Sequence, residues 1–308
     1  MAERVRVGTR GSPLALRQAE LVAEGLRRAW PGLVVELVPI RTSGDELANA
    51  SLATVGGKGL FVKEIEEALL ERRVDLAVHS LKDLPAGVPE GLVLAAFPER
   101  EDPRDVLVSR SAEGLRRLPA GARIGTSSLR RKLQLLAGRP DLVVEPIRGN
   151  VATRLRKLRE VPYDAVVLAA AGLRRLGLAP SGAVVLALDE MLPAVGQGTL
   201  AVEAREEDEA TRRLIAALDH GETRTATVAE RTFLAAMGGT CTTPLAAYAR
   251  YEAGRLVLSA FVATPDGSRC LRDAQILNKG TPADLGQIVA DRMLAKGAAE
   301  IIAAGQVG

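Results

Sequence analysis

The chain has 308 residues, which is long enough for two or three domains. Of these residues 47% are apolar and 26% are charged, a composition that is ordinary for a globular protein. The net charge is only +3 and aromatic residues make up 3%, which disfavours nucleic-acid binding, because that role calls for a strong positive field and stacking side chains. No apolar run reaches the roughly 18 residues of a transmembrane helix, no signal-peptide core opens the chain, and two cysteines make no disulfide framework. We therefore expect a soluble cytoplasmic protein without a membrane or nucleic-acid partner.

The first hundred residues alternate between strand and helix patterns. Short apolar strands are predicted at 5–8, 33–40 and 74–79. Apolar residues at helical spacing predict one helix over 14–30 and another over 56–69. Strands that alternate with helices predict an open, largely parallel α/β sheet.

Two proline-bearing segments, 97–104 and 192–198, are predicted to connect this lobe with a second one. Two crossovers between the same two lobes would form a hinge, with ligand bound in the cleft.

The second lobe contains two cationic turns, Gly125 to Arg131 and Arg148 to Arg154, and each turn follows an apolar run and enters a helical pattern. The first backbone N–H groups of a helix lack intrahelical partners, and the helix dipole adds partial positive charge there. Arginine adds a planar fork that matches a carboxylate or a phosphate. Two such turns predict a ligand with several negative groups.

The pattern changes after about residue 220. A helix is predicted at 225–237, then strands at 245–251, 256–264 and 270–277 joined by hairpin turns, then a closing helix at 282–304. The predicted fold class is α/β, with two hinged periplasmic-binding-protein-like α/β lobes plus a small C-terminal α+β domain that has a three-stranded antiparallel sheet. The predicted domains are 1–98 with 194–218, 99–193, and 219–308.

Ligands of open α/β sheets bind beyond the carboxyl ends of the strands. The polar residues predicted there are nearly all cationic, and the one carboxylate is Asp83. A carboxylate among cations should stay ionised, and it could stabilise a developing positive charge or transfer a proton. The alternative is that Asp83 caps a helix or pairs with Lys82.

Cys241 lies in a loop with two glycines and a proline, between a predicted helix and a predicted strand. A thiol near arginines could be a thiolate and act as a nucleophile. The alternative is a buried structural cysteine, which is also our expectation for Cys270. His79 is expected to be a hydrogen-bonded core histidine. Because no Cys or His spacing resembles a zinc site, we expect no metal.

Several motifs stand in a fixed order along the chain, and together they resemble the porphobilinogen deaminase family over nearly its whole length. The family is also called hydroxymethylbilane synthase. The motifs occupy 9–16, 55–61, 78–83, 101–105, 125–131, 148–150, 192–198 and the Gly-Thr-Cys loop at 239–241.

The resemblance implies a transferase of tetrapyrrole and haem biosynthesis. It would join four porphobilinogen molecules head to tail with loss of ammonia, and then release linear hydroxymethylbilane by hydrolysis. Growth would start on a dipyrromethane cofactor, held by a thioether to Cys241, with Asp83 as the catalytic carboxylate. The family expectation is a monomer.

The resemblance also implies a set of residues that hold the carboxylates of the cofactor and substrate. They are Arg10, Ser12, Lys58, Lys82, Thr126, Ser128, Arg130, Arg131, Arg148, Arg154 and Arg175.

Two positions depart from the family pattern. Thr54 stands where bacterial relatives can carry a lysine, and Thr240 stands where a glycine is usual before the cysteine. Neither change removes a residue assigned to the chemistry. A non-catalytic two-lobe protein that binds polyanions is the alternative function, and ammonia release from porphobilinogen would separate the two.

Overall fold

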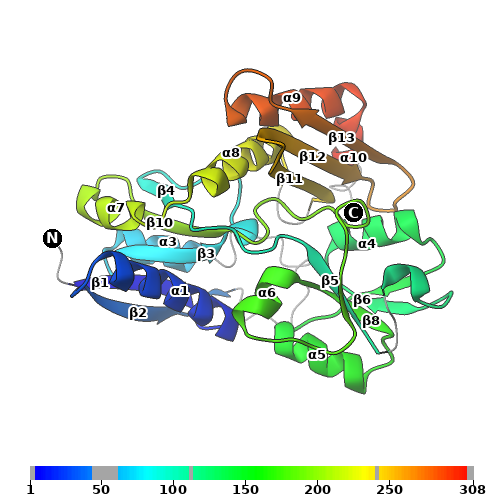
Figure 1. The fold of residues 1–308 in the computed structure, drawn as a ribbon, viewed down its shortest axis with the longest axis horizontal. Coiled ribbons are helices and arrows are strands. Elements are labelled where there is room, and N and C mark those ends of the chain that lie inside the picture. The colour runs from blue at the N-terminus through cyan, green and yellow to red at the C-terminus, as the bar shows by residue number, and fades with distance from the viewer. Residues whose placement is uncertain (1–3, 44–61, 111–113, 240–242, 304–308) are drawn as a thin grey trace. The chain divides into compact units, whose positions relative to one another are not determined.

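The computed structural model describes residues 4–43, 62–110, 114–239 and 243–303. The chain divides into two compact units (Figure 1). Unit 1 is Met1–Glu101 with Gly198–Arg224, and unit 2 is Asp102–Gln197 with Thr225–Gly308. The boundaries at 101–102 and 197–198 fall inside the two segments that the sequence analysis interprets as crossovers.

Unit 1 contains a five-stranded sheet with strand order β2-β1-β3-β10-β4. Its strands are β1 (Arg4–Arg10), β2 (Val34–Ile40), β3 (Leu76–Ser80), β4 (Leu92–Ala96) and β10 (Leu200–Arg205). β1 is parallel to β2 and β3, whereas β10 is antiparallel to β3 and β4. Apolar side chains of α1 (Pro13–Ala29) and α7 (Glu209–Ala216) pack on one face, and those of α3 (Lys63–Leu70) pack on the other.

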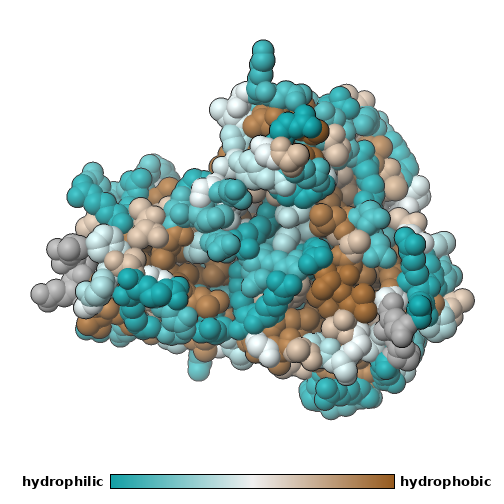
Figure 2. All heavy atoms as spheres, in the orientation of Figure 1, coloured by the Kyte–Doolittle hydropathy of each residue, from teal (hydrophilic) through white to brown (hydrophobic). Residues whose placement is uncertain are grey.

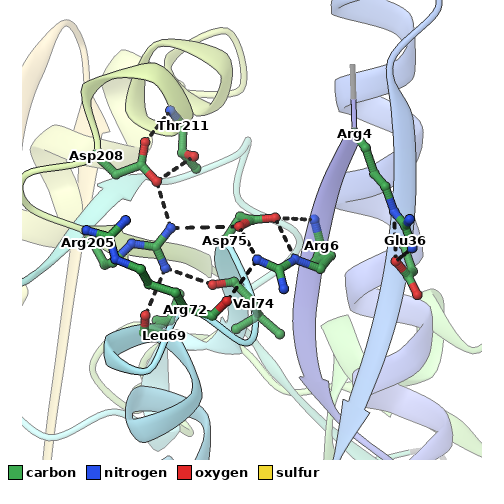
Figure 3. Close-up of polar contacts among 10 residues, drawn as sticks. All are labelled: Arg4, Arg6, Glu36, Leu69, Arg72, Val74, Asp75, Arg205, Asp208 and Thr211. Atoms are coloured by element: carbon green, nitrogen blue, oxygen red, sulfur yellow. Dashed lines mark hydrogen bonds and ion pairs between the residues drawn. The ribbon is translucent and has the colours of Figure 1, made fainter. Parts of the chain in front are cut away.

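The amino edge of this sheet is held by a network of ion pairs (Figure 3). Asp75 accepts hydrogen bonds from the backbone N–H of Arg6 at 2.8 Å and from its guanidinium at 2.8 and 3.1 Å. The buried guanidinium of Arg205 donates to Leu69 O and to Asp208, at 2.8 and 2.7 Å. Burial acts to raise the pKa of Asp75, but the hydrogen bonds from Arg6 outweigh it and hold that pKa below its ordinary value.

Unit 2 contains a second five-stranded sheet with strand order β7-β6-β8-β5-β9. Its strands are β5 (Asp105–Ser109), β6 (Arg123–Gly125), β7 (Val143–Glu145), β8 (Ala165–Ala169) and β9 (Ala183–Val185). β6 is parallel to β7 and β8, whereas β5 is antiparallel to β8 and β9. One core lies between the sheet and α4 (Leu129–Gly138), and the other lies under α5 (Val151–Glu160) and α6 (Ala170–Arg175). Figure 2 shows hydrophobic side chains gathered around β5, β6 and β8.

The C-terminal part of unit 2 is an antiparallel sheet in the order β11-β12-β13. Its elements are α8 (Gly221–Ala236), which contains the last unit boundary, β11 (Leu245–Glu252), β12 (Arg255–Ala263), β13 (Cys270–Ile276), α9 (Pro282–Ala295) and α10 (Ala298–Ala303). Phe261 of β12 shares a buried cluster with Leu133 of α4 and Leu192. This shared cluster explains why the small sheet belongs to the same compact unit as the second α/β sheet.

The structure confirms the predicted fold class and refines it in two places. Each α/β sheet is largely parallel but contains one antiparallel strand, β10 or β5, that the sequence analysis did not predict. The predicted closing helix over 282–304 is wrong as one element, because α9 ends at Ala295 and α10 begins at Ala298. Gly297 lies between them with a φ of +91°, a backbone conformation that ends a helix and favours glycine.

Candidate functional site

The carboxyl edge of the unit 1 sheet carries four of the predicted site residues. Because β1 and β3 are parallel neighbours, Arg10 at the end of β1 and Ser12 after it lie at the same edge as Lys82 and Asp83 after β3. Ser12 caps α1, and its hydroxyl oxygen accepts from the backbone N–H of Ala15 at 3.3 Å.

Two hydrogen bonds hold α1 against the end of β3. The side-chain amide of Gln18 donates to the hydroxyl of Ser80 at 2.8 Å, and that hydroxyl donates back to the amide oxygen at 3.1 Å. The start of α1 and the turn after β3 are thereby fixed relative to each other.

Asp83 ends a short 3-10 turn, η2 (Leu81–Asp83), and its side chain is exposed. Within the described residues, its carboxylate accepts no hydrogen bond and forms no ion pair. The alternatives of a helix cap or a pair with Lys82 are therefore absent from the described contacts. The carboxylate is available to a ligand.

His79 lies in β3, one residue before the strand ends at Ser80. Its side chain is buried, as predicted for a core histidine. Its Nε2 lies 3.0 Å from Oε2 of Glu203 in β10. Burial raises the pKa of the nearby Glu66 carboxyl, and the charge of Glu203 raises it further. This cluster supports the sheet beneath the edge.

The carboxyl edge of the unit 2 sheet brings the two cationic turns together. β6 and β7 are parallel neighbours, so the turn before α4 lies beside the turn before α5. The hydroxyl of Ser127 donates to Ile147 O at 2.7 Å and ties one turn to the other. Ser128 caps α4 and accepts from the backbone N–H of Arg131, while Thr126 accepts from Ser128 N at 3.2 Å.

Arg130 and Arg131 are buried, and both bind one carboxylate. Nη1 of Arg130 lies 2.8 Å from Oδ2 of Asp105, and Nε and Nη2 of Arg131 lie 3.0 and 2.8 Å from Oδ1. Asp105 is itself fully buried. Burial acts to raise the pKa of this carboxyl, but the charges of the two arginines hold it well below its usual range.

Arg154, in the first turn of α5, is the next cation at this edge. Its Nε donates to Gly149 O at 2.8 Å, and it forms no ion pair with any described residue. Burial, together with the charge of Arg131, lowers the pKa of Arg154 to about 10. The charged form of Arg154 is therefore disfavoured by its burial and by the charge of Arg131, and no described carboxylate pairs with it.

Arg148 and Arg175 are half-buried at the same edge, at the turn before α5 and the end of α6. The neighbour of Arg175, Arg174, donates to Oδ2 of Asp102 at 2.8 Å. Lys58 and Cys241, like Thr54 and Thr240, lie outside the described residues.

Sequence reasoning missed Asp105 as a member of this edge. It belongs to the 101–105 motif, which was recognised without a role being given to its residues. The signal that could have found it is an acidic residue directly after a crossover, at the start of an apolar run.

Residues 5–213 match the family described as "Porphobilinogen deaminase, dipyromethane cofactor binding domain", and residues 225–295 match "Porphobilinogen deaminase, C-terminal domain". The chain belongs to the porphobilinogen deaminase family. A curated relative of that name from Acidithiobacillus ferrooxidans is 52% identical over 303 residues and 98% of each chain. Another, from Desulforudis audaxviator, is 51% identical over 308 residues and 100% of each chain.

Among solved structures, the methionine binding protein MetQ is 16% identical to this chain with a TM-score of 0.45. The match covers 72% of this chain and 92% of that one.

The family confirms the predicted class of function, a transferase of tetrapyrrole biosynthesis, and the predicted dipyrromethane cofactor. No helix within the described ranges is long and apolar enough to cross a membrane. The same ranges contain no group of three or more His, Cys, Asp or Glu side chains that could hold a metal ion.

Proposed function

We propose that this chain is a hydroxymethylbilane synthase that uses the two sheet edges described above. It joins four porphobilinogen molecules head to tail, releases one ammonia for each, and frees hydroxymethylbilane by hydrolysis. Family membership over nearly the full length supports the activity. The non-catalytic polyanion-binding alternative keeps the anion sites but predicts no ammonia release.

The single observation that carries the site assignment is the partly buried guanidinium of Arg154, which lies near the charge of Arg131 and has no carboxylate partner among the described residues. A partly buried guanidinium without a carboxylate partner is stabilised when an anion binds. Each pyrrole unit of the cofactor carries an acetate and a propionate, so this donor set fits the cofactor's chemistry. Arg131 and Arg154 would hold carboxylates of the cofactor and of the substrate, with support from Arg148, Arg175 and the turn at Thr126 to Ser128.

Bound dipyrromethane would supply the free pyrrole position to which the first substrate unit is joined. In unit 1, Arg10, Ser12 and Lys82 would orient substrate carboxylates beside Asp83. Asp83 would accept hydrogen bonds from pyrrole N–H groups and stabilise the positive charge that develops as ammonia leaves. Its carboxylate is exposed and has no partner in the part of the chain that the structure describes, which supports this role.

Cys241 would attach the cofactor through a thioether, and Lys58 would add a cation near the substrate. Both assignments rest on the sequence motifs that contain these residues. We also propose a monomeric, cytoplasmic enzyme with the three-domain division 1–98 with 194–218, 99–193 and 219–308. The biosynthetic role of the family supports the location, and light scattering of the purified protein tests the oligomeric state.

The intact mass of the purified protein, with and without porphobilinogen, tests the function. We expect a mass above that of the sequence by two linked deaminated pyrrole units, rising in single-unit steps with substrate, together with released ammonia. A protein that keeps its sequence mass after incubation with porphobilinogen under reducing conditions, and releases no ammonia, would be a binding protein.

A further inference from the structure

Asp105 is a buried carboxylate at the carboxyl edge of the unit 2 sheet to which no role has yet been given. Its side chain is fully buried and accepts hydrogen bonds from three side chains. Two are the guanidiniums of Arg130 and Arg131, and the third is the amide of Gln197, whose Nε2 lies 3.0 Å from Oδ1. Gln197 also donates to Pro103 O at 2.7 Å, which fixes the amide.

The antiparallel direction of β5 explains how an acidic residue reaches this edge. Asp105 is the first residue of β5 and pairs with Ala169, the last residue of β8. A parallel strand at this place would begin at the opposite edge of the sheet. Asp105 therefore lies where α4 and α6 begin, within reach of arginines from α4.

Asp105 orients the two arginines but does not neutralise them. One carboxylate faces two guanidiniums, so the group keeps a net positive charge. Arg131 has five N–H donors, and its described contacts are two with Asp105 and one with Val167 O at 3.0 Å. The pKa of Arg154 is lowered first by its burial and then by the charge of Arg131, so Asp105 does not cancel that charge.

We propose that Asp105 is a positioning residue for carboxylate recognition, because it holds Arg130 and Arg131 in the orientation that binds the acidic groups of the substrate and cofactor. This inference rests on the proposed function. It separates binding from chemistry, since Asp83 stands on the other unit and keeps its own surroundings.

The variant Asp105→Asn tests the proposal. An amide keeps one acceptor oxygen but turns its NH₂ toward a guanidinium, so one arginine loses its partner. We expect the KM for porphobilinogen to rise roughly tenfold, the effect of losing one charge-assisted hydrogen bond, while kcat stays within about twofold. The porphobilinogen concentration that half-loads the cofactor-free chain, measured by intact mass, should rise by a similar factor.

Asp208→Asn is the matched control. Asp208 also binds a buried arginine, Arg205, and it caps α7 through Thr211 at the amino edge of unit 1 (Figure 3). It should lower the melting temperature but leave KM and cofactor loading unchanged. A general effect of lost stability would instead move both variants alike, which would overturn the positioning role.

If Asp105→Asn does not fold, Gln197→Met tests the same proposal. Methionine keeps the volume of glutamine but removes the amide donor to Asp105, so a rise in KM of about threefold at unchanged kcat is expected. Unchanged KM and loading in a folded Asp105→Asn, or in Gln197→Met when the first variant fails, would overturn the inference. Failure of the wild-type chain to load or to release ammonia would instead refute the proposed function.

Discussion

Replacing Arg154 by glutamine should stabilise the cofactor-free protein and weaken substrate binding. Burial, together with the charge of Arg131, lowers the pKa of Arg154 from its ordinary value to about 10, and at 1.36 kcal/mol for each pKa unit the charged form costs ~3 kcal/mol in the folded state. Solvent screens this half-buried side chain, so we expect roughly 1–2 kcal/mol. Because the group is charged in both folded and unfolded chains below pH 10, the full cost is present at pH 7.

Arg154→Gln also removes the hydrogen bond to Gly149 O, which offsets about 0.5–1 kcal/mol. The net gain of about 1 kcal/mol should raise the melting temperature of the cofactor-free protein by about 2 °C. In the loaded enzyme the same change removes a charge-assisted contact worth roughly 1.5–3 kcal/mol, so the KM for porphobilinogen should rise at least about tenfold.

Arg156→Gln is the control on the same helix. Arg156 is exposed and pairs with Glu160 at 2.8 Å, an i,i+4 pair worth about 0.3–0.5 kcal/mol. It should change neither KM nor, beyond about 1 °C, the melting temperature. If Arg154→Gln lowered the melting temperature of the cofactor-free protein, the cost of holding a charged Arg154 partly buried near Arg131 would be refuted. An unchanged KM would remove Arg154 from the binding site.

Four further variants test other parts of the structure. Asp83→Asn should reduce kcat by at least about 100-fold with little change in melting temperature, because its carboxylate has no described partner; turnover near that of the wild type would refute its role. Cys241→Ala should carry no covalent pyrrole by intact mass, whereas Cys270→Ala should carry it in full. Asp75→Asn should cost about 2 kcal/mol of unfolding free energy at pH 7 without changing KM. The Asp75 pKa is lowered in the folded state, so this difference is present above pH 3.8 and should shrink as the pH falls further; a constant difference would contradict the assignment.

Much of the fold follows from local patterns in the sequence. The hairpin between β11 and β12 was predicted because Ala253 and Gly254 separate two apolar runs, and both have positive φ in the structure. The strands β5 and β10 were missed because each begins next to a crossover, where prolines together with charged residues (before β5) or glycines (before β10) obscure the start of the apolar run. Their direction depends on where the chain re-enters the sheet, which no local pattern encodes.

The candidate site could be predicted only as a set of residue types. Small hydroxyls followed by arginines indicated two anion-binding turns, and the structure brings those turns together through β6 and β7. The sequence did not separate Arg130 and Arg131, which bind a buried carboxylate, from Arg154, which binds none among the described residues. That difference depends on Asp105, which is distant in sequence from all three.

The two sheets place their antiparallel strands in the same way, and this shared feature explains how crossover residues reach the ligand-binding edges. In unit 1 the first residue of β10, Leu200, pairs with Ser80, the last residue of β3. In unit 2 the first residue of β5, Asp105, pairs with Ala169, the last residue of β8. Residues that directly follow a crossover therefore lie at the carboxyl edge of each sheet, where parallel strands end and ligands bind. A substitution directly after such a crossover should therefore change the binding of substrate and cofactor, although the sequence there resembles a linker. Asp105→Asn is the sharpest test of that expectation.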